Sequence, residues 1–123
     1  MSNEAGAPSK TDCVFCRIIT KELPADVVAE NAHALAFTDL SPGAPTHVLV
    51  VPKRHIRDAT ELSTTDGALL CALIELANDV AHRKGIDRSG FRLVLNVGDD
   101  AGNTVEHLHL HLLGGRSFSW PPG

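Results

Sequence analysis

The chain has 123 residues and a mass of 13.1 kDa, which fits a single domain. Acidic residues outnumber basic residues by 15 to 11, and the formal net charge of −4 argues against non-specific nucleic-acid binding as the main role. With 43% hydrophobic residues the chain is expected to fold. Because only 4% are aromatic and none is Tyr, its core is expected to consist of Leu, Val, Ile and Ala.

Apolar runs, the first residues and the cysteines bear on the cellular compartment of the protein. No apolar run approaches the ~18–20 residues that span a bilayer, so no membrane partner is expected. Residues 1–11 are small and polar and have no apolar signal-peptide centre. We therefore expect a flexible tail over residues 1–11, a domain over residues 12–123, and a cytoplasmic location. In that compartment the three Cys residues are not expected to form disulfides.

A short helix is predicted near the start of the domain, over residues 13–21. Phe15, Ile18 and Ile19 fall at i, i+3 and i+4, and Asp12 could cap the helix. Short apolar segments between turn residues indicate strands over residues 26–30, 34–38, 47–51, 91–97 and 105–113.

A longer helix is predicted over residues 66–84. Apolar residues recur there at helical spacing, Thr64 or Thr65 could cap its start, and Gly85 is placed to end it in a left-handed conformation. Cys71 lies within this helix and is expected to be a small buried apolar residue. Strands on both sides of one long helix predict an α+β fold with a largely antiparallel sheet.

The most informative segment alternates histidine with leucine from His107 to Leu112. On a strand, His107, His109 and His111 would project from one face and the three Leu residues from the other. A polar outer face explains three imidazoles poorly, which leaves a metal site or covalent catalysis by one imidazole. The preceding loop, residues 98–104, offers backbone N–H groups and side chains that could hold a phosphate.

A second pattern is Cys13-x-x-Cys16. Two cysteines at this spacing supply half of a tetrahedral zinc site. A redox pair and two incidental thiols are the alternatives, although a redox pair usually follows a strand that is not predicted here.

The run from His107 to Leu113 has the form His-x-His-x-His-x-x with apolar x, and the chain resembles the histidine triad (HIT) superfamily, in particular its Hint branch of nucleoside phosphoramidases. Further segments that resemble this branch are residues 13–24, 36–52, 53–56, 114–116 and 120–123, the last of which reads Trp-Pro-Pro-Gly.

The resemblance implies a HIT-like fold, a five-stranded antiparallel sheet with one long and one short helix, in a homodimer. It also implies hydrolysis of purine nucleoside phosphoramidates or aminoacyl-adenylates. His109 would be the nucleophile and would form a nucleotidyl-histidine, with its other ring nitrogen bonded to a backbone carbonyl. His111 and His47 would lie near the phosphate, with His47 or a water relaying protons. Thr104 would contact the phosphate and the leaving amine.

The resemblance also implies the remaining nucleotide contacts. Asn96 and Asn103 would bond the 5′ oxygen and the phosphate, Asp39 would accept both ribose hydroxyls, and Trp120 would reach the partner's site and act on the leaving group. The base pocket would consist of Phe15, Ile18, Leu23, Phe37 and Leu40. Thr38 stands where the family more commonly has His.

The resemblance completes the metal set as well. His55 and His107 would join Cys13 and Cys16 around a structural zinc ion. Two other functions remain open at this point: hydrolysis of dinucleoside polyphosphates, the activity of a related branch, and a regulatory role in which a nucleotide is bound without catalysis.

Overall fold

The computed structural model describes residues 12–123, and the predicted tail over residues 1–11 lies outside the described residues. The described chain forms one five-stranded antiparallel sheet with strand order β1-β2-β3-β5-β4. The strands are β1 (Val27–Glu30), β2 (Ala34–Thr38), β3 (Thr46–Pro52), β4 (Phe91–Leu95) and β5 (Leu110–Gly114), and the helices are α1 (Val14–Ile19) and α2 (Gly67–Arg83). This confirms the predicted α+β architecture.

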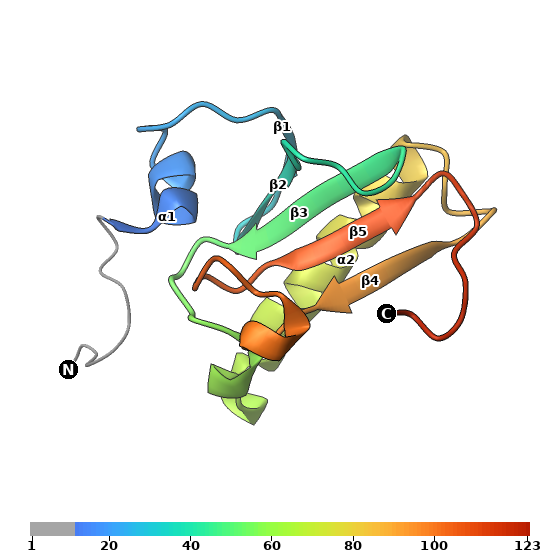
Figure 1. Cartoon of the computed structure of the whole chain (residues 1–123). Helices are drawn as coiled ribbons and strands as arrows, with labels where there is room; N and C mark the ends of the chain where they lie inside the picture. Colours follow the sequence, from blue (N-terminus) through green and yellow to red (C-terminus); the bar gives the residue numbers. More distant parts are fainter. Residues whose placement is uncertain (1–11) are drawn as a thin grey trace.

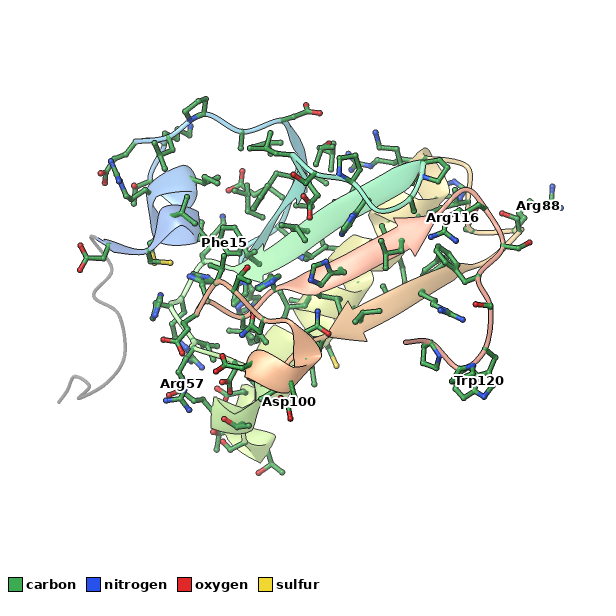
Figure 2. All side chains as sticks on the ribbon, in the orientation of Figure 1. Phe15, Arg57, Arg88, Asp100, Arg116 and Trp120 are labelled. Carbon is green, nitrogen blue, oxygen red and sulfur yellow. The ribbon has the colours of Figure 1, made fainter. Side chains whose placement is uncertain are left out.

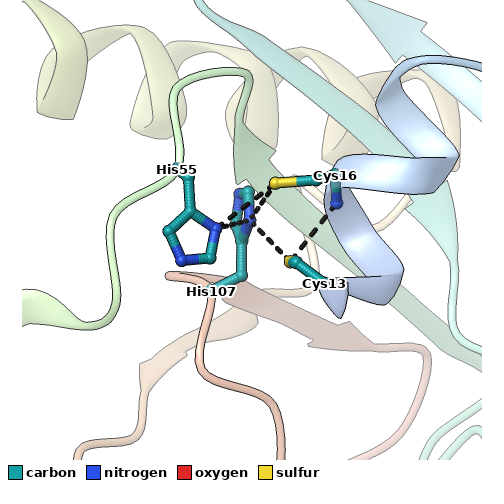
Figure 3. A group of neighbouring side chains, drawn as sticks. All are labelled: Cys13, Cys16, His55 and His107. Atoms are coloured by element: carbon teal, nitrogen blue, oxygen red, sulfur yellow. Dashed lines mark hydrogen bonds between the residues drawn. The ribbon is translucent and has the colours of Figure 1, made fainter. Parts of the chain in front are cut away.

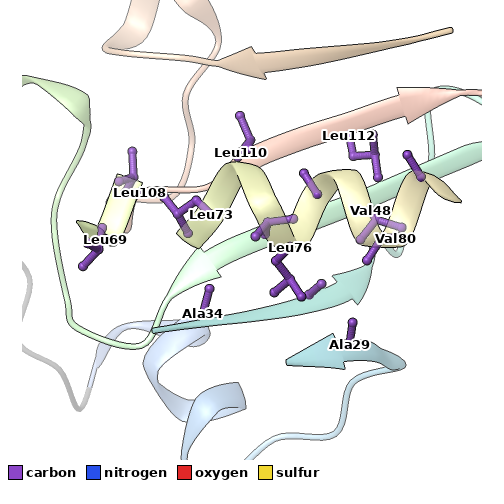
Figure 4. Close-up of a cluster of buried hydrophobic side chains, with 14 of the residues drawn as sticks. Ala29, Ala34, Val48, Leu69, Leu73, Leu76, Val80, Leu108, Leu110 and Leu112 are labelled. Atoms are coloured by element: carbon purple, nitrogen blue, oxygen red, sulfur yellow. The ribbon is translucent and has the colours of Figure 1, made fainter. Parts of the chain in front are cut away.

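The long helix α2 lies across one face of the sheet and α1 lies near the other face (Figure 1). Strand residues that point toward α2, such as Val48, Val50 and Leu112, are almost fully buried against Leu73 and Val80 of the helix (Figure 4). Burial of this apolar surface is the main force that holds the helix on the sheet.

A second apolar cluster covers the opposite face of the sheet. Phe15 of α1 packs there against Phe37 of β2, with the ring centroids 5.5 Å apart, and Leu49 and Val51 of β3 complete it. Because Leu49 is paired with His111 in the β3–β5 ladder, the histidines belong to this face.

Both predicted helix caps are wrong by one or two residues, because the N-cap of α1 is Cys13 and that of α2 is Asp66. The N-cap of α1 is Cys13, whose sulfur accepts the Cys16 N–H at 3.4 Å, and not Asp12. Thr64 lies within a 3₁₀ turn, Thr64–Asp66, that precedes α2, and Ser63 forms a capping box with Asp66. A capping box satisfies two backbone N–H groups at once, which a lone threonine cannot do.

Two further expectations about α2 have opposite outcomes. Gly85 follows the helix with φ of +74°, as predicted. Cys71 is exposed, so its prediction as a buried residue is wrong. Neither helix in the described part of the chain has the length and apolar character needed to cross a membrane.

The last strand begins later than predicted, at Leu110, so His107 and His109 precede it. The ladder cannot extend further because β4 ends at Leu95 and Pro52, at the end of β3, has no N–H. The Leu108 N–H donates instead to the Ile56 carbonyl at 2.6 Å.

Candidate active site and metal centre

The three histidines of the triad still follow one another along one face. The Phe15 ring touches His107 and His109 with centroid distances of 5.8 and 5.2 Å, and the centroids of His109 and His111 are 5.0 Å apart. The chain stays extended enough before β5 for alternate side chains to share a side.

His109 has a fixed tautomer. Its Nδ1 lies 2.7 Å from the backbone carbonyl oxygen of His107, and a carbonyl can only accept, so Nδ1 carries the hydrogen. The Nε2 atom of neutral His109 therefore keeps its lone pair, which is the form that a nucleophilic imidazole needs.

His111 has the opposite tautomer, and His47 on β3 sets it. The Gly43 N–H donates to His47 Nδ1 at 2.9 Å, so the hydrogen of neutral His47 is on Nε2. That atom lies 2.9 Å from His111 Nδ1, which must accept, so the hydrogen of His111 is on its Nε2. Within residues 12–123 this buried Nε2 has no hydrogen-bond partner.

Burial keeps His111 neutral. Burial, together with nearby His109 and His47, lowers the pKa of His111 to about 4, although the Asp39 carboxylate acts in the opposite direction. At neutral pH His111 is therefore an uncharged N–H donor on the triad face.

Beside these rings lies a cavity of about 330 Å³ between α1, the sheet and residues 104–105. Eight of the predicted site residues line it, and these are Phe15, Ile18, Phe37, Asp39, Leu40, Thr104, His109 and His111. The wall is mainly apolar, and among the described residues neither Lys nor Arg lines it. Such a cavity suits a flat apolar ring with a few directed polar contacts.

The other predicted residues of this site lie outside that cavity. His47 does not line the cavity itself but contacts His111, which does. Leu23 and Asn96 are half-buried and do not line the cavity. Asn103 has a buried side-chain oxygen that lacks a hydrogen-bond partner within the described chain. Trp120 is 82% exposed on the C-terminal segment (Figure 2).

Sequence reasoning missed several residues of the cavity wall, among them Val14, Leu49 and Val105. Leu49 could have been found, since it lies two residues after His47 on the same strand and therefore on the same face. Val14 and Val105 come from the ends of separate segments and carry no such periodic signal.

A cluster beside this cavity brings together the four predicted metal ligands, Cys13, Cys16, His55 and His107 (Figure 3). Their ligand atoms all lie within 4.8 Å of one another. Nδ1 of His107 is 3.2 Å from the Cys13 sulfur, 3.5 Å from the Cys16 sulfur and 3.2 Å from Nδ1 of His55. Zinc bonds of ~2.0–2.3 Å give a tetrahedron with edges of about 3.3–3.8 Å, and the observed separations of 3.2, 3.5 and 3.2 Å lie in or just below this range.

The protonation state of His107 also fits a metal ligand. The ring is fully buried, its Nε2 lies 2.9 Å from the Pro52 carbonyl oxygen, and burial lowers its pKa to about 4. Because Nε2 donates to that carbonyl, Nδ1 presents a lone pair to the cluster. A backbone carbonyl that accepts from the other ring nitrogen commonly orients a metal-binding imidazole.

Comparison with known proteins agrees with this fold and this set of histidines. A family model described as "HIT domain" matches residues 20–118, and the chain therefore belongs to the HIT family. A curated relative, an uncharacterized HIT-like protein of Synechococcus elongatus, is 46% identical over 91% of this chain and 97% of its own length.

Solved structures of HIT family proteins match this chain over most of its length. The HIT family hydrolase of Legionella pneumophila has a TM-score of 0.88 and 46% identity, and the match covers 91% of this chain and all of that one. A histidine triad family protein of Mycobacterium smegmatis, described as Zn-bound, has a TM-score of 0.74 and 29% identity over 94% of this chain and 82% of its own.

Proposed function

We propose that this HIT protein hydrolyses purine nucleoside phosphoramidates and aminoacyl-adenylates through a nucleotidyl-histidine on His109. One observation carries the proposal: the His109 Nδ1–H bond to the His107 carbonyl, at 2.7 Å, leaves the Nε2 lone pair available beside the cavity. Similarity to structures named HIT family hydrolases supports hydrolysis in general.

The reaction would proceed in two displacements at phosphorus. In the first, the His109 Nε2 lone pair forms a bond to the α-phosphorus, the P–N bond breaks, and the amine leaves with a proton supplied by solvent, directly or by way of His47. In the second, water attacks phosphorus, the bond to His109 breaks and returns the electron pair to Nε2, the water gives up a proton to solvent, and the nucleoside monophosphate is released. The His111 Nε2–H would donate to a phosphoryl oxygen while negative charge builds up there.

The cavity offers a place for each part of such a substrate. Phe15, Ile18, Phe37 and Leu40 would hold the purine, and Asp39 would accept the ribose hydroxyls. The Thr104 hydroxyl would contact the phosphate and the leaving amine. The remaining proposed contacts with the substrate come from Leu23, Asn96, Asn103 and Trp120. Trp120 would be contributed by the second subunit of a homodimer.

The charge at the site favours a phosphoramidate over a dinucleoside polyphosphate. Asp39 is the one charged side chain among the described residues that line the cavity. A polyphosphate chain with several negative charges would lie beside this carboxylate without a cation to offset it. A phosphoramidate monoester has one negative charge, which neutral N–H and O–H donors can stabilise.

We propose that Cys13, Cys16, His55 and His107 hold a structural zinc ion, because their donor atoms and spacing fit one. Four protein ligands leave no open position for chemistry, so the metal would support the segment before β5 instead of acting on the substrate. Cysteine thiolates kept as metal ligands suit a reducing compartment, and we propose a cytoplasmic location.

A homodimer is also proposed. The edge strand β4 has unpaired backbone groups on one side, and Leu95 and Val97 at its end are 37% and 39% exposed. A second copy could cover this edge. Light scattering of the purified protein would measure the mass directly.

The proposed activity is tested with an adenosine phosphoramidate that bears a fluorescent amine. The wild type should release the amine, His109→Ala should lose this activity by a factor of 10³ or more, and His82→Ala should retain it, since His82 is an exposed residue of α2. Mass spectrometry of quenched wild-type protein should find adenylate on His109. Turnover of diadenosine polyphosphate alone would contradict the proposal, as would full activity of His109→Ala.

A further inference from the structure

Asp39 lies where the nucleotide cavity meets the pair of hydrogen-bonded histidines. Its side chain is 20% exposed and lines the cavity, while its Oδ2 atom lies 3.4 Å from His47 Nε2. A ribose-binding role uses the side of the carboxylate that faces the cavity. The contact with His47 is a second role that ribose binding does not require.

The Nε2–H group of His47 therefore faces two acceptors. His111 Nδ1 is the nearer at 2.9 Å, and Asp39 Oδ2 is the farther at 3.4 Å. The negative charge of the carboxylate favours a ring orientation that points N–H toward it. A flipped His47 ring would lose this attraction together with the bond from Gly43.

Asp39 is itself held in place on its other oxygen. Oδ1 accepts the Ser41 N–H at 2.8 Å, and the Asp39 N–H donates to the His47 carbonyl at 3.0 Å. The loop after β2 and the start of β3 are thus tied together at this residue. A carboxylate meets both demands, one on each oxygen, whereas an asparagine has one acceptor oxygen for two donors.

We propose that Asp39 is a positioning residue that fixes the His47–His111 pair, so that the Nε2–H of His111 is directed at the phosphate. The effect of Asp39 then reaches the phosphate through His47 and His111 and adds to any contact with ribose. This inference rests on the proposed function for its catalytic consequence, but the arrangement of the rings exists without substrate.

A divalent metal ion at the same three side chains is the main rival interpretation, since their ligand atoms lie within 4.8 Å of one another. Such an ion would need the Nε2 lone pair of His47. The Gly43 N–H occupies Nδ1 of that ring, so Nε2 carries the hydrogen and has no lone pair to offer. A network of hydrogen bonds fits these three side chains better.

The first test measures ring tautomers by ¹⁵N NMR in the ligand-free protein. In the wild type, His47 and His111 should both have an unprotonated Nδ1 and a protonated Nε2. In Asp39→Asn, the His47 ring should also sample the flipped orientation, in which it loses the bond from Gly43, so that His47 or His111 shows a mixture of tautomers. Asp79→Asn on α2 removes the same charge and should leave both rings unchanged. Unchanged tautomers in Asp39→Asn would overturn the proposal.

The second test separates positioning from ribose binding by removing the hydroxyls from the substrate. With a 2′,3′-dideoxyadenosine phosphoramidate, Asp39→Asn should still lower kcat by about tenfold or more, as expected for a misdirected donor. If Asp39 acts through the ribose alone, this variant and the wild type will have the same kcat on the dideoxy substrate, and the proposal fails. Should no phosphoramidate be hydrolysed at all, the proposed function fails and the NMR result alone decides the role of Asp39.

Discussion

The Cys13, Cys16, His55 and His107 cluster leads to a quantitative prediction about metal and stability. We consider Cys16→Ser, because the Cys16 sulfur lies 3.3 Å from His55 and 3.5 Å from His107 and so contacts both imidazoles. The ligands come from three segments far apart in sequence, and Cys16 and His107 are 91 positions apart. A bound ion would therefore hold together parts of the chain that separate on unfolding.

The size of the effect follows from linkage between binding and folding. When free zinc is ~1,000-fold above its dissociation constant, native-state binding adds about 4 kcal/mol to the free energy of unfolding. At roughly 4 °C per kcal/mol for a domain of this size, the melting temperature should rise by about 15 °C. In Cys16→Ser most of this zinc-dependent rise should disappear.

The assay compares melting temperatures with zinc and after treatment with a chelator, together with the zinc content per chain. Cys71→Ser is the matched control, because Cys71 is exposed on α2 and lies outside the cluster. It should keep about one zinc per chain and the full response to chelator. Equal zinc content and equal chelator response in Cys16→Ser and the wild type would refute the metal site.

Three further predictions concern stability. Leu112→Ala should lower the free energy of unfolding by about 3 kcal/mol, because Leu112 is fully buried, whereas Leu40→Ala at 96% exposure should change it little; urea unfolding that ranks them equally would contradict this. Gly115→Ala should lower the free energy of unfolding by about 2 kcal/mol, since φ is +90° and the new Cβ would lie 2.8 Å from Pro45 Cβ. An unchanged melting temperature would contradict this prediction. The free energy of unfolding should also fall as the pH drops from 6.5 to about 4, because burial lowers the pKa of His111 and in this range only the unfolded chain binds a proton there. If the free energy of unfolding depends on pH no more steeply in the wild type than in His111→Asn, this reasoning is wrong.

The sequence predicted the architecture well where apolar periodicity was strong. The helix over residues 66–84 and the observed α2, Gly67–Arg83, differ by one residue at each end. The N-cap of α2 is Asp66, and not Thr64 or Thr65, because residues 64–66 form a 3₁₀ turn before the helix begins. Ser63 caps that turn, and the Asp66 side chain accepts the Ser63 N–H at 3.0 Å.

The last strand shows what periodicity alone leaves out. Alternation of His and Leu fits an extended chain over the whole run, but pairing needs a partner with a free N–H. Pro52 lacks one, and its carbonyl accepts from the His107 ring instead. Such a stop depends on a residue 55 positions away in the sequence.

Contacts between residues far apart in the chain, or in two chains, are also what sequence patterns leave out at the candidate site. Phe15 of α1 and Phe37 of β2, which the resemblance implies as contacts of the base, both line the cavity. Trp120 belongs to a proposed contact across a dimer, and a single described chain leaves it exposed. No pattern within one chain specifies a contact with a second copy.

His109 and His111 are the same residue type two positions apart, yet their hydrogens are on opposite ring nitrogens. The difference arises at Nδ1: His109 donates there to a carbonyl, while His111 accepts there from His47. One ring consequently offers a lone pair at Nε2 and the other offers an N–H. The proposed attack on phosphorus would use both, an electron pair for the new bond and a donor for the charge that develops on oxygen. The backbone and side-chain partners of the two Nδ1 atoms, and not the histidines themselves, therefore determine which ring can act as the nucleophile.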